Sequence, residues 1–437
     1  MRASNATSAT TAAGPPSCRY GRHDTPQLAI PSCGSGRHDT TAAGPPSCRY
    51  SRHDTPQLAI RKVLFVLLVA VTCLPTAGLS QTPPQATAGV VPGRPERYGG
   101  HEDHVGKKWL VQLNGDPGSY ALQHWGCYDP SHAPHAIQPE GSIGMTSPGG
   151  GNWYHNGFFN FAVDGDQSRM YPVAAIRALD SGERASAEFL WDMPKAWVRV
   201  RFVVIPGQRP LFGAITQIPK AGAAPKLRVR LVAYPAGYFK DGGRVIVTPT
   251  RTLKTGDKVD LDPATEWSWI MYDEKRDLHV EGSVGGAGGL TVPDLVGTVK
   301  LDVGAYGVSW DLEAKGNELR FAFWGSQEQT NAELQTKLAA QFAPALADLR
   351  ALDFTPLKLQ PPGLAQLQAE FAKLFAETKG SEGSRKAYEA LLGELQALRA
   401  QIGGGQVNLQ AENGYLGVLD KLDQLLWKVR MDWIFAD

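Results

Sequence analysis

The chain has 437 residues, of which 42% are apolar and 20% charged, so it can bury a sizeable core and form two or three domains. Its formal net charge is +1, but the first eighty residues hold eight basic and three acidic residues, which leaves 36 basic against 40 acidic residues in the remainder. Because that remainder has no basic run or arginine-rich stretch, no nucleic-acid partner is expected.

A tandem repeat dominates the first sixty residues. The segment TTAAGPPSCRYGRHDTPQLAI at 10–30 returns at 40–60 with Ser51 in place of Gly21, and part of it occurs again at 31–40. The copies agree even at polar positions and contain no apolar stripe, whereas structural repeats keep mainly the positions that stack. We expect residues 1–60 to be disordered and to come from a start site assigned too far upstream. The alternative is a metal site built from the repeated His23, His38, His53, Cys18, Cys33 and Cys48.

Residues 61–80 have the three-part form of a secretory signal peptide. Arg61 and Lys62 precede an unbroken apolar run at 63–74, and Gly78-Leu79-Ser80 then places small side chains three residues and one residue before Gln81. An apolar run of about twelve residues is shorter than the ~20 that cross a bilayer, so no stable membrane span is expected. The protein is predicted to be secreted or periplasmic, with cleavage after Ser80.

Cleavage at that position would leave Cys127 as the single cysteine. No intramolecular disulfide is then possible, and the fold must rest on its apolar core, which the length of the chain permits. We expect the Cys127 thiol to be buried and inert, the alternative being an exposed reactive thiol.

Residues 81–100 are rich in proline and are predicted to be a linker, and residues 101–326 are predicted to be a β-sandwich domain. In WVRVRFVVI at 197–205, apolar residues alternate with Arg199 and Arg201, and LRVRLVA at 227–233 and ELRFAF at 318–323 alternate in the same way. Turn signals such as Asp164-Gly165 separate these runs. About a dozen strands without an intervening helical pattern predict a mainly β fold, a large antiparallel β-sandwich followed by an α-helical C-terminal segment.

The C-terminal segment, residues 327–437, changes to helical periodicity. Apolar stripes predict helices over 331–352, 363–379, 384–402 and 413–435, and Pro344 is expected to kink or split the first of them. Each stripe must be buried on a neighbouring helix, on the sandwich or on a partner chain. Packing within the chain is the favoured interpretation, and a homo-oligomer formed through these helices is the alternative.

Six of the ten histidines fall between residues 101 and 155, in a stretch that we expect to form long loops. Acid–base catalysis needs an imidazole poised beside a carboxylate, and His155, His124 and Glu140 are the candidates for it. The alternative interpretation is a set of solvated loop side chains.

The paired histidines His101/His104 and His132/His135 are the candidate metal ligands. Their spacing differs from the i, i+4 pair of a helical zinc site, and no second cysteine accompanies them. Neither a metal nor a cofactor is therefore predicted. The glycine run GGAGG at 285–289 leads into an extended segment instead of a helix, and is interpreted as a flexible turn and not as a phosphate-binding loop.

Aromatic and amide side chains gather in GGGNWYHNGFFNF at 149–161. Flat rings stack on the apolar face of a sugar while neighbouring polar groups bind its hydroxyls, so a ligand-binding surface is predicted from Trp125, Trp153, Tyr154 and Asn156. Trp267 and Trp269, two apart and therefore on one side of a strand, are further candidates. The alternative for all these rings is core or rim packing.

Three runs carry a family resemblance: NWYHNGFFNFAVDG, RFVVIPGQRPLFGAI and the strands from VIVTPTRTL to LRFAFWG. Together they resemble exported β-proteins of the galactose mutarotase-like supersandwich type. The resemblance implies carbohydrate-facing chemistry, in which a histidine acid and a glutamate base act on the sugar ring, but no motif here places that pair.

The function predicted from the sequence is an exported carbohydrate-binding or carbohydrate-processing β-sandwich protein with a glycan or polysaccharide as its partner. If it is an enzyme, it is a sugar epimerase, lyase or hydrolase that uses His/carboxylate chemistry. The alternative is a non-catalytic structural or scaffold protein whose C-terminal helices mediate assembly.

Overall fold

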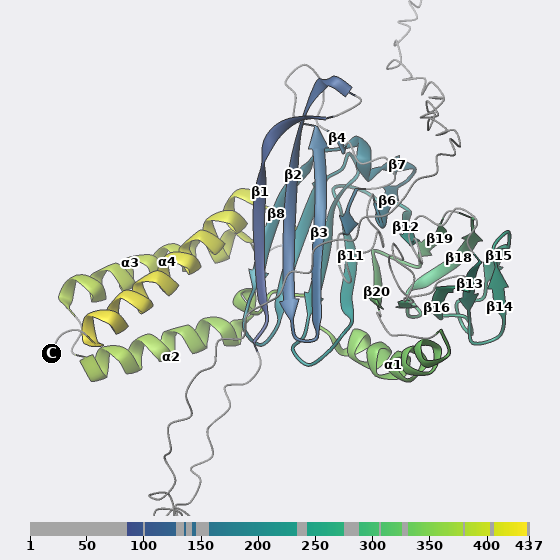
Figure 1. Ribbon diagram of the computed structural model, residues 1–437. Helices are drawn as coiled ribbons and strands as arrows, with labels where there is room; N and C mark the ends of the chain where they lie inside the picture. The colour runs from purple at the N-terminus through teal and green to yellow at the C-terminus, as the bar shows by residue number, and fades with distance from the viewer. Residues whose placement is uncertain are drawn as a thin grey trace, which may run out of the picture. The chain divides into compact units, whose positions relative to one another are not determined.

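The computed structural model describes residues 85–98, 101–127, 135–136, 142–145, 157–233, 243–274, 288–305, 307–325, 331–378, 381–402 and 406–434 (Figure 1). Its contacts divide the chain between Leu79 and Ser80, and all of these residues belong to the second unit. The predicted repeat and signal peptide lie outside the described residues.

The fold is mainly β, with three antiparallel sheets followed by four helices, as predicted. The largest sheet has nine strands in the order β14-β13-β16-β17-β20-β11-β10-β9-β8. Their bounds are β8 Val173–Asp180, β9 Ala185–Asp192, β10 Ala196–Val204, β11 Leu211–Pro219, β13 Arg244–Val247, β14 Thr252–Lys254, β16 Ser268–Asp273, β17 Gly288–Thr291 and β20 Glu318–Gly325.

The second sheet has six strands in the order β15-β18-β19-β12-β6-β7. Their bounds are β6 Phe159–Val163, β7 Asp166–Gln167, β12 Leu227–Ala233, β15 Lys258–Leu261, β18 Val296–Val303 and β19 Val308–Ala314. The third sheet has five strands, in which β1-β2-β3-β4 follow one another and β5 also pairs with β3. Their bounds are β1 Thr87–Tyr98, β2 His101–Gly115, β3 Gly118–Cys127, β4 His135–Ala136 and β5 Gly144–Met145.

One apolar core joins the three sheets, and the alternation in the sequence explains which side chains enter it. Val198, Val200 and Phe202 of β10 are fully buried there, while Arg199 and Arg201 point to the opposite face of the sheet. The predicted alternation in β12 and β20 is confirmed in the same way, since their odd-numbered apolar residues from Leu227 to Leu231 and from Leu319 to Phe323 belong to this core. The outward residues of the six-stranded sheet are therefore free to form a surface.

The five-stranded sheet corrects two predictions. The segment predicted to be a linker contains β1, which pairs with β2 from Thr87–Asn114 to Tyr98–His101, and much of the predicted histidine-rich loop region is strand β2 or β3. Pro92 and Pro95 misled the sequence analysis, but an edge strand accepts proline because its outer N–H groups have no partner strand to lose.

Two close approaches in the nine-stranded sheet require glycine. A Cβ on Gly289 would lie 2.7 Å from the ring of Trp324, and one on Gly213 would lie 2.4 Å from the ring of Phe321. The glycine run at 285–289 was predicted to be a flexible turn, but its last two residues begin β17 and make room for an indole. The prediction of a tight turn at Asp164-Gly165 is confirmed, because both residues have positive φ and connect β6 to β7, as type I′ hairpins require.

The four helices are α1 Asn331–Ala351, α2 Pro361–Thr378, α3 Glu382–Ile402 and α4 Leu409–Ile434, with short 3₁₀ turns η1 Ser168–Met170 and η2 Leu357–Leu359 elsewhere. Helix α1 runs through Pro344 without splitting, since Leu338, Phe342 and Leu349 on both sides of the proline are buried against the nine-stranded sheet. Their burial offsets the hydrogen bond that the proline cannot make.

Helices α2, α3 and α4 bury their apolar stripes against one another, with Phe371, Leu395, Tyr415 and Leu422 at the centre. Among the described residues, the stripes are therefore covered within the chain, as favoured above, and assembly through these helices stays a prediction. No helix in the described ranges is both long and apolar enough to cross a membrane.

Candidate functional site

A groove crosses the outer face of the six-stranded sheet. It consists of two adjoining hollows, of about 400 Å³ and about 320 Å³, that share Lys300 and Asp311. The larger hollow is lined by Asn160, Phe161, Ala162, Gln167, Arg228, Val229, Arg230, Thr298, Lys300, Asp311, Leu312 and Glu313. The smaller is lined by Lys258, Val259, Asp260, Lys300, Leu301, Asp302 and Asp311. The groove therefore runs across the strands from β7 to β15.

The register of the strands fixes which charges meet in this groove. On β12 and β19, Arg228 lies opposite Glu313 and Arg230 lies opposite Asp311. On the other side of β19, Asp311 lies opposite Lys300 of β18. Asp311 thus stands between basic side chains of both neighbouring strands, whereas Glu313 lies opposite Arg228 on β12 and Thr298 on β18. Such cross-strand pairs of opposite charge stabilise a sheet.

The ion pairs in the groove are unequal. Glu313 accepts from Lys226 Nζ at 2.7 Å, and this contact, more than Arg228 Nε at 3.4 Å, lowers the pKa of the carboxyl group. Asp311 lies 3.3 Å from Arg230 Nη1, and Lys300 Nζ is 4.0 Å from Asp260. Since exposed pairs at such distances contribute little free energy, the basic groups of the groove are available to a ligand.

A buried polar cluster supports the β6 end of the groove. Asn160 Oδ1 accepts hydrogen bonds from Ser168 Oγ at 2.7 Å and from Ser142 Oγ at 3.3 Å, and the two hydroxyl oxygens lie 2.6 Å apart. These contacts hold the Asn160 amide in one orientation. Its oxygen is occupied, so Nδ2 is the atom that this side chain can offer to a ligand in the groove.

His124, one of the predicted catalytic residues, lies behind the same cluster. Its Nδ1 donates to the carbonyl oxygen of Ser142 at 2.7 Å, and its ring contacts the rings of Trp109 and Trp191. Only 1% of the residue is exposed, and burial lowers its pKa to about 4. His124 is therefore neutral at pH 7 and packs in the interior, where it positions Ser142 and does not face the groove.

The other predicted site residues fall into three groups. Trp125 is half-buried on β3, on the opposite face from His124. His101, His104 and His135 lie on β2 or β4, and their side chains are outside the described set. The remaining candidates lie outside the described residues altogether, namely His132, Glu140, Trp153, Tyr154, His155 and Asn156.

Two further predictions are tested by burial. Trp269 is fully buried in the main core, whereas Trp267 packs with the α1 cluster, so the two do not form one face. The reason is that β16 begins only at Ser268, so its alternation does not reach Trp267. Cys127 is buried, as predicted. Within the described ranges, no three residues of the metal-ligating types converge.

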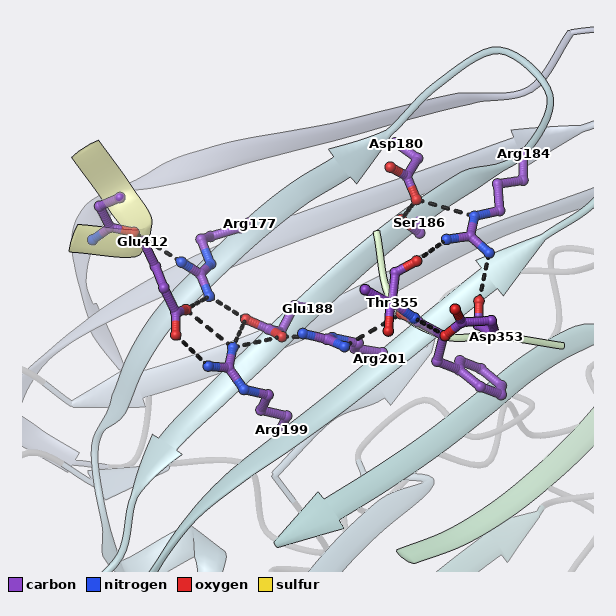
Figure 2. A network of polar contacts seen from close by, with 12 residues as sticks. Arg177, Asp180, Arg184, Ser186, Glu188, Arg199, Arg201, Asp353, Thr355 and Glu412 are labelled. Atoms are coloured by element: carbon purple, nitrogen blue, oxygen red, sulfur yellow. Dashed lines mark hydrogen bonds and ion pairs between the residues drawn. The ribbon is translucent and has the colours of Figure 1, made fainter. Parts of the chain in front are cut away.

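A second charged cluster, on the outer face of β8, β9 and β10, was not predicted (Figure 2). Glu188 is fully buried and pairs with Arg177, with Arg199 at 3.1 Å and with Arg201 at 2.7 Å, while Glu412 of α4 pairs with Arg177 at 2.9 Å and with Arg199. Every carboxylate in this cluster is held by guanidinium groups. The cluster therefore attaches α4 to the sheet and is not a site for a ligand.

The loop after α1 is attached beside it. Arg184 donates to the carbonyl oxygens of Asp353, at 2.6 Å, and Thr355, and is itself held by Asp180 at 3.1 Å. Asp180 also accepts from the backbone N–H of Leu357 at 2.8 Å. The alternation of β10 predicts its outward arginines, but no local pattern indicates their partners, which lie 153 and 213 residues away in the chain.

Comparison with known proteins found no matching family model and no matching curated protein. Among solved structures, the chain is similar to the GH36 α-galactosidase AgaB of Geobacillus stearothermophilus, with 9% identity, a TM-score of 0.31 and coverage of 50% of this chain and 40% of that one. It is also similar to the α-galactosidase of Lactobacillus brevis, with 11% identity, a TM-score of 0.30 and coverage of 58% and 41%.

The protein solved as HI1317 is matched over 99% of its length and 55% of this chain, with 9% identity and a TM-score of 0.27. The chain thus spans about two fifths of the length of the two α-galactosidases. At such TM-scores we draw nothing from these matches about fold family or activity.

Proposed function

We propose that the protein binds a carbohydrate chain in the groove of the six-stranded sheet. The observation that supports this most directly is that two hollows in series share Lys300 and Asp311, so that one extended ligand could occupy both. Neighbouring strands lie about 4.8 Å apart, which is close to the length of one sugar ring. A chain lying across the strands would meet a new set of side chains at about every residue.

The lining matches the hydrogen-bonding needs of sugar hydroxyls. Each hydroxyl both donates and accepts, and the larger hollow offers carboxylates as acceptors together with guanidinium and amide groups as donors. Asn160 is already oriented by Ser142 and Ser168, so binding through it costs little conformational entropy. The groove is open along its length, which suits a polymer better than a small metabolite.

The aromatic residues predicted from the sequence remain part of this proposal. Trp153, Tyr154, His155 and Asn156 directly precede Gly157, and only three residues separate Asn156 from Asn160. We propose that they add a stacking surface at this end of the groove. Export through the signal peptide at 61–80, which would place the protein where polysaccharides occur, is proposed with it.

The test is binding to an array of neutral and acidic glycans, followed by titration calorimetry on the strongest ligand. Substituting Asn160 and Gln167 together by alanine should weaken binding at least tenfold, since two hydrogen-bonding side chains are lost. Trp153→Ala with His155→Ala should also weaken it. Lys373→Ala, on the exposed surface of α2, is the matched control and should leave affinity unchanged. Binding to no glycan, or full binding by the groove variant, would refute the proposal.

A further inference from the structure

The charges of the groove are distributed unevenly along its length. At the β12 end, Arg228, Arg230 and Lys300 line the larger hollow with two carboxylates, Glu313 and Asp311, and Lys226 contacts Glu313 from outside the lining. Lys300 is shared with the smaller hollow, where Asp260 lies 4.0 Å from it. At the β15 end, Lys258 faces Asp260 and Asp302, with which it shares the smaller hollow. One end is therefore positive and the other negative, although the chain as a whole is nearly neutral.

Arg228 and Lys300, at the positive end, keep unused donors, whereas Arg230 donates to Asp311 and to Ser309 Oγ. Glu313 is bound closely by Lys226 at 2.7 Å, which leaves Arg228 with one long contact, Nε to Oε2 at 3.4 Å. Within the part of the chain that the structure describes, the two terminal amino groups of Arg228 have no hydrogen-bond partner. Its side chain is 63% exposed, and that of Lys300 is 69% exposed. A guanidinium with two parallel N–H groups free is the group best suited to bind a planar carboxylate.

The spacing of these cations fits a repeating ligand. Arg228 and Arg230 are on β12 and Lys300 is on β18, with β19 between them. Strands β12 and β18 are therefore two strand spacings apart, or roughly 10 Å. This distance is about the length of two sugar residues in an extended chain. Every second anionic group of a chain lying across the strands could therefore meet a basic side chain.

From this placement, we infer that the groove selects an anionic polysaccharide, with acidic groups of the chain bound by Arg228, Arg230 and Lys300. The inference rests on the proposed function and names the class of glycan. Carboxylates of uronic acids and sulfate esters share the chemistry that these side chains recognise. A nucleic acid is disfavoured, because the described lining holds a single aromatic residue, Phe161, and its ring is buried in the core, so no base could stack there.

The experiment compares matched ligands by calorimetry on the full chain. Oligomers of galacturonate, mannuronate and glucuronate are each measured beside their carboxyl-reduced, neutral counterparts, with a sulfated galactan oligomer and a single-stranded oligonucleotide as further arms. We expect at least one charged oligomer to bind roughly tenfold more tightly than its neutral counterpart, and we expect this preference to decrease as salt increases. Comparison of the uronate and sulfate arms identifies the acidic group.

The Arg228→Gln, Arg230→Gln double variant should bind charged and neutral oligomers within about twofold of each other. Arg350→Gln, an equally exposed arginine on α1, should keep the full preference. Unchanged circular dichroism and unfolding midpoints would show that both variants fold.

Equal binding of charged and neutral oligomers by the native protein would overturn this inference and leave carbohydrate binding intact. Binding to none of these sugars would overturn both proposals, and binding to the oligonucleotide alone would point to another class of ligand.

Discussion

At the scale of single residues, His124 shows how position in a strand decides whether a side chain reaches a surface. It follows Tyr120 and Leu122 at every second position of β3, and these two residues face the core. The alternation that places a histidine in line with buried residues was present in the sequence, and it favours a packing role over a catalytic one.

The burial of His124 predicts a specific dependence of stability on pH. Its pKa is lowered from 6.5 to about 4 in the folded protein, so between these values the unfolded chain binds a proton that the folded chain does not. The contribution of His124 to the free energy of unfolding is therefore present above pH 6.5 and is lost as the pH falls toward 4. It amounts to roughly 3 kcal/mol.

This prediction can be measured by urea unfolding at pH values from 7.5 to 4.5. His124→Asn keeps a donor near the position of Nδ1 but does not titrate, so the difference in unfolding free energy between the native protein and the variant should shrink as the pH falls. Parallel curves for the two proteins across this range would contradict the assignment of the shift to burial of His124.

At the scale of elements, the strands with regular alternation and all four helices were predicted from the sequence, and their bounds agree within a few residues. The failures have identifiable causes. Pro92 and Pro95 hid β1, because proline disfavours central strands but not edges. Pro344 suggested a kink or a split in α1, and the helix does not split, because the nine-stranded sheet buries the residues on both sides of the proline.

The attachment of α4 to the sheet yields a prediction about two carboxylates that lie side by side. Burial disfavours the charge of Glu188, but Arg201, Arg199 and Arg177 outweigh that effect and lower its pKa. Glu188→Gln would leave three guanidinium groups without this partner and should reduce the free energy of unfolding by about 3–5 kcal/mol. In the native protein, the stabilisation that Glu188 provides is present when the pH is above the pKa of a glutamate in the unfolded chain. It declines as the pH falls below that pKa, because the unfolded chain then binds a proton that folded Glu188 does not.

Glu412→Gln should act differently, because Arg177 and Arg199 would still be paired with Glu188. We expect faster hydrogen exchange in the first turns of α4, around 409–414, with a smaller change in global stability. Glu313→Gln, in a partly exposed cross-strand pair, is the control and should change stability by about 1 kcal/mol or less. Equal losses in all three variants would show that the buried cluster has no special role.

At the scale of the whole molecule, the mainly β architecture and the helical C-terminal segment followed from the periodicity of the sequence. The groove did not, because it depends on which strands become neighbours. Arg228 lies 85 residues from Glu313 in the chain, and it meets the β18–β19 hairpin that carries Lys300 and Glu313 only through the order β18-β19-β12. Local patterns report which face a side chain occupies, whereas the assembly of a surface from several strands is a property of the topology.

The position of the core in the chain predicts how a chain without the proposed leader behaves. Within the described ranges, the residues of the three apolar clusters begin at Ala86 and all belong to the unit Ser80–Asp437. A chain that begins at Gln81 should therefore unfold at the same temperature as the full chain. Since Cys127 is then the single cysteine and is fully buried, a reducing agent should not change that temperature.

Calorimetry with and without dithiothreitol checks the stability of the shortened chain, and the intact mass of exported protein checks cleavage after Ser80. The corresponding control is a chain that begins at Leu110, and it lacks Ala86, β1 and more than half of β2. This chain should fail to fold, because the five-stranded sheet loses its edge strand. A large loss of stability in the Gln81 chain would mean that residues 1–80 belong to the folded structure. The prediction of a removable leader would then be wrong, and with it the physical basis for placing this groove outside the cytosol.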